Sequence, residues 1–81
     1  MPDISATFTN KYSESRKWVI VDTGRDPNSP PIVFNDYLEP DQSTAQLTLY
    51  SDGFGGHAQY QRSDGAVTNV DVSDGDNVAM S

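Results

Sequence analysis

Carboxylate and amide side chains gather in short turns of the second half of the chain. Ser-Asp-Gly occurs at 51–53, 63–65 and 73–75, and the stretch 71–77 (DVSDGDN) holds three carboxylates and an amide within seven residues. Calcium takes six to eight oxygen ligands, which flexible acidic loops can supply. One interpretation is therefore a calcium site formed by the loops 51–53 and 71–77, with candidate ligands Asp52, Asp74, Asp76 and Asn77. The alternative is turn chemistry alone, because Asp-Gly is the pair that tight hairpins prefer.

Catalytic arrangements are harder to assemble from this sequence. His57 is the single histidine and follows Gly55-Gly56, a position typical of a solvated loop residue. No nucleophile-elbow motif surrounds any serine, and Gly53-Phe-Gly-Gly precedes a predicted strand and not a phosphate-binding helix. All acids except Asp71 lie in or beside predicted turns or strand ends, so we expect most carboxylates to be exposed and their pKa values not to be raised by burial. The sequence predicts a protein that is not an enzyme.

Loop aromatics and a proline-rich loop suggest a recognition surface instead. Tyr37 and Phe54 lie in or near polar loops, and the stretch 24–31 (GRDPNSPP) is stiffened by proline and presents Arg25. The candidate partner-binding residues are Arg25, Tyr37 and Phe54, for a protein or glycan ligand, with inhibitor-like docking of the 22–31 loop as one form. This interpretation predicts that Arg25→Ala or Tyr37→Ala weakens capture of a partner without lowering the melting temperature. The alternative is that the aromatics only cap a small sandwich.

Charge narrows the choice of partner. Twelve Asp and Glu against five Lys and Arg give a formal net charge of −7, and Lys11, Arg16 and Lys17 are the only clustered cations. Phosphate backbones and anionic membranes require clustered cations, so neither nucleic acid nor membrane is an expected partner. Cationic partners or divalent metals fit the negative electrostatic field of this chain better.

Length and composition limit the architecture to one small domain. The chain has 81 residues and no cysteine, which excludes disulfides and thiolate metal sites. Because a small core gives limited stability, we expect that a homodimer through a sheet edge could supply further burial. The chain starts Met1-Pro-Asp-Ile-Ser, without signal-peptide features, and its longest apolar run, Trp18 to Val21, is far short of a membrane span.

Period-two alternation predicts strands throughout, separated by turns about every ten residues. The pattern indicates an all-β fold, a small Greek-key-like antiparallel β-sandwich of six to eight short strands, forming a single domain over 1–81. The unbroken run from Trp18 to Val21 predicts a central strand that is buried on both faces. The expected strands are 4–9, 16–22, 32–38, 43–50, 57–62, 66–72 and 77–80. The expected core comprises Phe8, Trp18, Ile20, Phe34, Leu38, Leu47, Leu49, Ala58, Tyr60, Val70, Val72, Val78 and Met80.

The segment from Tyr50 to His57 resembles the Greek-key signature of βγ-crystallins, an aromatic residue, a short turn and then aromatic-x-glycine. Tyr50, Phe54 and Gly56 occupy those positions, with one residue fewer between the aromatics than usual. Residues 76–81 (DNVAMS) are similar to that family's calcium-loop pattern, although Met80 stands where a hydroxyl is expected. The resemblance covers roughly 47–81 and implies two Greek keys, with calcium held by carbonyls near Gly53 and by Asp76, Asn77 and Ser81.

Overall fold

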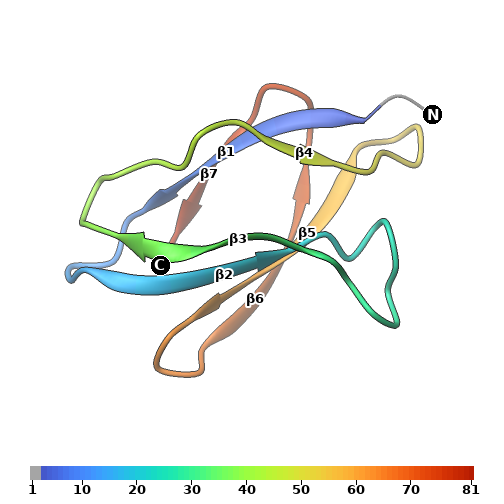
Figure 1. Ribbon diagram of the computed structural model, residues 1–81. Helices are drawn as coiled ribbons and strands as arrows, with labels where there is room; N and C mark the ends of the chain where they lie inside the picture. Colours follow the sequence, from blue (N-terminus) through green and yellow to red (C-terminus); the bar gives the residue numbers. More distant parts are fainter. Residues whose placement is uncertain (1–2) are drawn as a thin grey trace.

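The protein is a two-layered β-sandwich, seen here in a computed structural model that describes residues 3–81 (Figure 1). No helix occurs among these residues, so none of them forms a helix that could cross a membrane. The seven strands are β1 (Ile4–Asn10), β2 (Arg16–Val21), β3 (Ile32–Leu38), β4 (Leu47–Leu49), β5 (Gly56–Arg62), β6 (Val67–Val72) and β7 (Asn77–Met80).

The strands divide into two sheets, one of three strands in the order β4-β1-β7 and one of four in the order β3-β2-β5-β6. The chain crosses between the layers from β1 to β2, from β3 to β4, from β4 to β5 and from β6 to β7. All pairings are antiparallel except β1 with β7, which run in the same direction with Phe8 beside Val78. This parallel pair differs from the purely antiparallel sandwich expected. The two strands are parallel because β7 starts at the same end of the three-stranded sheet as β1 and runs alongside it.

Alternation along the strands places one set of side chains between the layers. Phe8, Trp18, Ile20, Leu49 and Met80 are fully enclosed. The Trp18 ring lies edge-on to the Tyr60 ring with centroids 5.8 Å apart. Most of the expected core is confirmed, and the structure adds Ile4 and Ala6. Four expected core residues, one each in β3, β4, β6 and β7, are only partly buried against it, namely Phe34, Leu47, Val70 and Val78. Tyr12 and Val33, which were not expected in the core, are partly buried in the same way.

Two expectations about strands are wrong. The predicted strand 43–50 shrinks to Leu47–Leu49, with an isolated bridge between Thr9 and Ser43, because the pairing with β1 shifts by one residue between that bridge and the pair Ala6–Leu47. Strand β2 is central in its sheet but not buried on both faces. Val19 and Val21 stay half-exposed because no layer covers the outer face of the four-stranded sheet.

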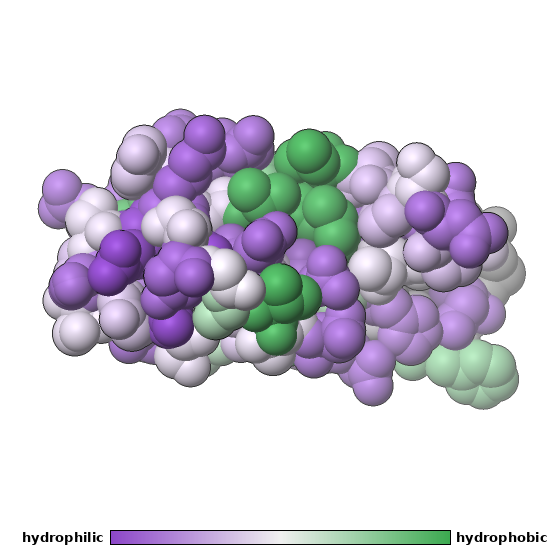
Figure 2. All heavy atoms as spheres, turned by 90° about the horizontal axis from the view of Figure 1, so that it is seen from below, coloured by the Kyte–Doolittle hydropathy of each residue, from purple (hydrophilic) through white to green (hydrophobic). Residues whose placement is uncertain are grey.

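That uncovered outer face carries a small apolar area within polar surroundings (Figure 2). Its apolar members are the half-exposed Val19 and Val21 together with the exposed Ile32 and Val67. The registers of β2 with β3 and of β5 with β6 place all four on the same side of the sheet. The face therefore lines up short aliphatic side chains next to amide side chains of β5 and β6.

Candidate functional site

Three connections meet at one end of the sandwich, which we call the loop end: the β2–β3 loop (22–31), the β4–β5 loop (50–55) and the β6–β7 loop (73–76). The first two are joined through the carboxylate of Asp22, which is fully buried. This carboxylate accepts hydrogen bonds from the backbone N–H and the Nε of Arg25 at 3.2 and 3.3 Å and from the backbone N–H of Tyr50 at 2.8 Å. The buried charge is thus compensated by several donors, as a carboxylate inside a protein requires.

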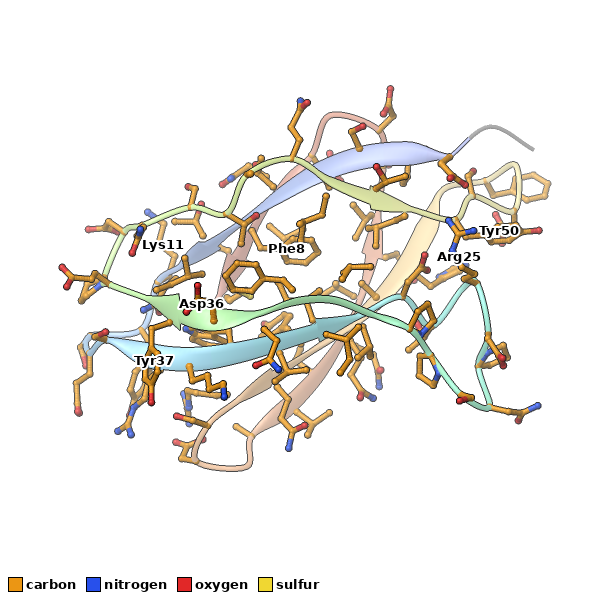
Figure 3. The ribbon with its side chains drawn as sticks, in the orientation of Figure 1. Phe8, Lys11, Arg25, Asp36, Tyr37 and Tyr50 are labelled. Carbon is orange, nitrogen blue, oxygen red and sulfur yellow. The ribbon has the colours of Figure 1, made fainter. Side chains whose placement is uncertain are left out.

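Arg25 links the same network to the first strand. Its Nη2 lies 3.2 Å from the carboxylate of Asp3, and its guanidinium stacks over the Tyr50 ring at 5.8 Å (Figure 3). The hydrogen bond to Asp3 raises the pKa of the Arg25 guanidinium further above its ordinary value. The β2–β3 loop is closed at its base by a bond from the Asp22 N–H to the carbonyl of Pro31. The proline-rich loop is therefore held against the sandwich at its start.

The β4–β5 loop is short and internally bonded, and it presents Phe54. Asp52 accepts a hydrogen bond from the N–H of Phe54 at 2.8 Å, and Ser51 Oγ accepts one from the N–H of Gly53 at 3.2 Å. Gly53 and Gly55 have φ of 101° and 126°, values that side-chain-bearing residues rarely adopt. The Phe54 side chain at the tip is 98% exposed. A large apolar ring thus stands in solvent on a conformationally restricted loop.

His57 connects this loop to the outer strand β6. Its Nδ1 lies 2.8 Å from the carboxylate of Asp71 and its Nε2 lies 3.2 Å from that of Asp52. The hydrogen bonds to Asp71 and then Asp52 raise the pKa of His57 above its ordinary value. The N–H of Phe54 and then the ring of His57 lower the pKa of Asp52. This geometry stabilises the imidazolium form of His57 between two carboxylates relative to a free imidazole.

The chemistry open to His57 follows from its two partners. A general base needs a neutral ring nitrogen within reach of the proton that it removes. Here each ring nitrogen already faces a carboxylate, and both contacts stabilise the protonated ring, which suits a structural clasp. The backbone adds to this clasp, because Gly24 donates its N–H to the carbonyl of His57 at 3.2 Å.

The candidate calcium loops lie at the loop end, but their side chains serve separate local bonds. Asp74 accepts the N–H of Ser5 at 2.9 Å, and Asp76 accepts the N–H of Ser73 at 2.9 Å. The amide of Asn77 donates to the hydroxyls of Thr7 and Thr9 on β1. Asp52, in the other loop, bonds Phe54 and His57 as described above.

Within residues 3–81 no group of three or more acidic or histidine side chains has an arrangement that could hold a metal ion. Gly53 lies in the β4–β5 loop, whereas Ser81 follows β7 at the opposite end of the molecule. Five residues of extended chain separate Asp76 from Ser81, which corresponds to about 16 Å. The six residues proposed as ligands are therefore not gathered around one ion, and calcium binding stays a prediction that solution measurements must test.

The structure also separates the three candidate partner-binding residues. Arg25 and Phe54 belong to neighbouring loops of the loop end, which Asp22 ties together. Tyr37 lies toward the other end of β3, where it pairs with Lys17, and its side chain is 65% exposed (Figure 3). A partner that contacts Arg25 and Phe54 at the loop end would not use Tyr37 in the same small patch.

Known proteins supply no further guide. No protein-family model, curated protein or solved structure matches the chain. The resemblance to βγ-crystallins accordingly stays a prediction, and the geometry of the chain itself carries what can be inferred about function.

Sequence reasoning missed the residue that organises the loop end. Most acids were expected to be exposed, with Asp71, inside a strand, as the exception, yet Asp71 is 89% exposed and Asp22 is fully buried. Asp71 alternates outward along β6, whereas Asp22 leaves β2 beneath the two loops that it joins. The only signal in the sequence was the spacing from Asp22 to Arg25, three residues that allow a local ion pair.

Proposed function

We propose that this protein is a non-enzymatic recognition domain that binds a partner protein through the loop end, with Phe54 as its apolar anchor. The observation that carries the proposal is a phenylalanine side chain with 98% exposure on an internally bonded loop. Aromatic anchors that fill a pocket of the partner dominate many protein interfaces. Burial of this ring in a pocket of the partner would remove its apolar surface from water.

Preorganisation of the surrounding loops supports the proposal. Binding costs less when loops are already ordered, because their conformational entropy has been lost during folding. The β4–β5 loop is fixed by Asp52 and His57, and the β2–β3 loop by Asp22 and two consecutive prolines, Pro30 and Pro31. These bonds hold Phe54 next to a stiff neighbouring loop.

Charge specifies the chemistry of the partner surface. Asp52 and Asp71 flank the Phe54 loop, and the whole chain has a formal net charge of −7. A complementary partner presents an apolar pocket with basic residues around it, since opposite charges steer association and disfavour wrong partners. Arg25 adds a half-exposed cation to the loop end, although its guanidinium is shared with Asp3 and Asp22.

The order of the loop can be measured without a partner. Backbone ¹⁵N relaxation of residues 51–56 should give order parameters close to the rigid-backbone value of about 0.85. Values below about 0.6 for Phe54 would contradict a preorganised anchor.

Partner capture then tests the anchor itself. The experiment immobilises the wild-type protein, Phe54→Ala and Tyr37→Ala. It compares the amount of partner protein that each captures and then the affinity of each for any purified partner so found. Both substitutions remove an exposed aromatic ring, so Tyr37→Ala is the matched control. Binding should be lost in Phe54→Ala and kept in Tyr37→Ala, with melting temperatures unchanged. Equal binding by wild type and Phe54→Ala would refute the proposal.

A further inference from the structure

The four sheet edges of the sandwich differ in how they are protected from pairing with another chain. An edge strand presents unpaired N–H and C=O groups, and natural proteins block such edges with short strands, prolines, bulges or charges. Strands β4 and β7 are edges of only three and four residues. The two longer edges, β3 and β6, belong to the same sheet and can be compared directly.

Strand β3 carries several blocking features. Pro30 and Pro31 precede it, and its register with β2 shifts at Ile20/Val21. Asp36 opposes Trp18 and therefore lies on the sandwich side of the strand, opposite to Tyr37 (Figure 3). Its carboxylate accepts the N–H of Tyr37 at 2.7 Å, so that outward-facing donor is already occupied. A new strand cannot pair here without displacing this bond.

Strand β6 has none of these features. It spans six residues without proline or charge except Asp71, and its register with β5 is regular. Arg62 donates its N–H to the carbonyl of Ala66 at 2.8 Å, which fixes the phase of the ladder. Antiparallel pairs alternate, so Thr68, Val70 and Val72 bond β5 while the backbone groups of the residues between them face outward. Figure 1 shows β6 as the outermost strand of its sheet.

We propose that β6 pairs with β6 of a second copy of this chain, in antiparallel orientation about a two-fold axis at Val70. The outward-facing backbone groups require odd-numbered residues to oppose odd-numbered residues. The axis at Val70 then places Asn69 opposite Asp71 of the second copy, twice by symmetry. The two four-stranded sheets become one continuous eight-stranded sheet.

The side chains of β6 are complementary to themselves in this register. The Oδ1 of Asn69 accepts a bond from Gln59 at 3.1 Å, which leaves its amide hydrogens as donors toward the second copy. Asp71 is 89% exposed and bonds His57 through one oxygen, so it keeps acceptor capacity for that amide. On the inner side, Val70 meets its own counterpart and Thr68 meets Val72. No carboxylate opposes another carboxylate across the new pair.

The size and charge of this contact predict a weak dimer. One pair of six-residue strands buries less area than a standard protein interface, so we expect a weak dimer with a dissociation constant of about 10 µM to 1 mM. Each copy has a formal net charge of −7, so repulsion opposes association and added salt should strengthen it. This inference does not rest on the loop-end proposal, because it concerns the edge of β6 and another partner, although Asp71 belongs to both surfaces.

Sedimentation equilibrium combined with amide hydrogen exchange tests the pairing. From about 10 µM to about 1 mM, the mass should rise from monomer toward dimer. The N–H groups of Asn69 and Asp71 should become protected over the same concentration range. Those of Thr68 and Val70, which bond β5, should be protected throughout.

Matched proline substitutions on the two edges provide the control. Asn69→Pro removes an outward N–H of β6, and Asn35→Pro removes the equivalent outward N–H of β3, without removing a ladder bond within the chain. Asn69→Pro should stay monomeric and Asn35→Pro should dimerise like wild type, with circular dichroism confirming that both are folded. A wild type that is monomeric at about 1 mM, or protection at other edges only, would overturn the proposal. Dimerisation of Asn69→Pro with wild-type affinity would do the same.

Discussion

The buried carboxylate of Asp22 accepts a 2.8 Å hydrogen bond from the backbone N–H of Tyr50, 28 positions further along the chain. This bond joins the end of β2 to the start of the β4–β5 loop. The loop that presents Phe54 and the proline-rich loop are therefore fixed by one side chain. Several consequences of this arrangement can be measured.

Asp22→Ala should lower stability by about 3 kcal/mol, because it leaves the Tyr50 N–H without its buried acceptor and removes one of the two carboxylate partners of Arg25. In a domain of this size, the corresponding fall in Tm is more than about 10 °C. Thermal unfolding followed by circular dichroism checks it. Asp26→Ala, in the same loop, removes an exposed carboxylate that bonds only the N–H groups of Asn28 and Ser29 and should change Tm far less.

Arg25→Ala should also lower Tm, by less than Asp22→Ala, because Asp22 keeps two backbone donors when the guanidinium is removed. This revises the expectation from the sequence that Arg25→Ala leaves the melting temperature unchanged. The structure gives the reason, since Arg25 Nε lies 3.3 Å from the buried carboxylate. An Arg25→Ala protein with the same melting temperature as the wild type would show that the ion pair contributes nothing measurable to stability.

Stability should depend on pH through the His57 clasp. The pKa of His57 is raised in the folded state from an ordinary value of 6.5, so its contribution is fully present below about pH 6.5 and is lost as pH rises through the folded value. The pKa of Asp52 is lowered from 3.8, so its contribution is lost as pH falls through its folded value. Urea unfolding should therefore show stability declining on the alkaline side.

His57→Gln is the control for this pH dependence, because the amide keeps hydrogen-bonding capacity but does not titrate. The alkaline decline should disappear in His57→Gln. NMR titration of the single imidazole should give a midpoint above 6.5 in the wild type and a lower one in Asp71→Asn. A midpoint at or below 6.5 in the folded wild type would contradict the clasp.

Glycine substitutions should report the close approach of the β4–β5 loop to β6. An added Cβ at Gly55 would lie 2.9 Å from the carbonyl oxygen of Val72, whereas one at Gly65 would meet nothing within 4 Å. Both residues have positive φ, so Gly65→Ala should cost about 1 kcal/mol from backbone strain alone. Gly55→Ala should cost clearly more, and equal losses in chemical unfolding would show that the loop can move away from β6.

The calcium hypothesis predicts a calcium-specific rise in melting temperature. A site of micromolar affinity should add about 5 kcal/mol at about 5 mM calcium relative to EDTA, and magnesium should not reproduce it. Asp76→Ala should abolish this calcium-dependent rise. The rise, and not the melting temperature itself, is compared between wild type and variant, because the substitution also removes the bond from the Ser73 N–H. Identical melting temperatures in EDTA and in calcium would mean that the acidic residues serve only to form the turns.

The sequence by itself determined most of the strands and most of the core. Alternation places Phe8, Ala58 and Tyr60 on inward faces, and Asp-Gly marks the hairpin turn at Asp64-Gly65, because both signals act over a few neighbouring residues. The exposure of Phe54 also follows from its position in a glycine-rich turn.

Only the tertiary structure decided which residues meet. The burial of Asp22, the clasp of His57 by Asp52 and Asp71, the separation of Tyr37 from Arg25 and the open edge of β6 all depend on strand order. Strand order is set by packing and by hydrogen bonds between residues far apart in the chain. Local periodicity carries no information about those pairings. The resemblance to a calcium-loop motif therefore grouped Ser81 with Asp76, whereas β7 lies between these two residues and separates them along its length.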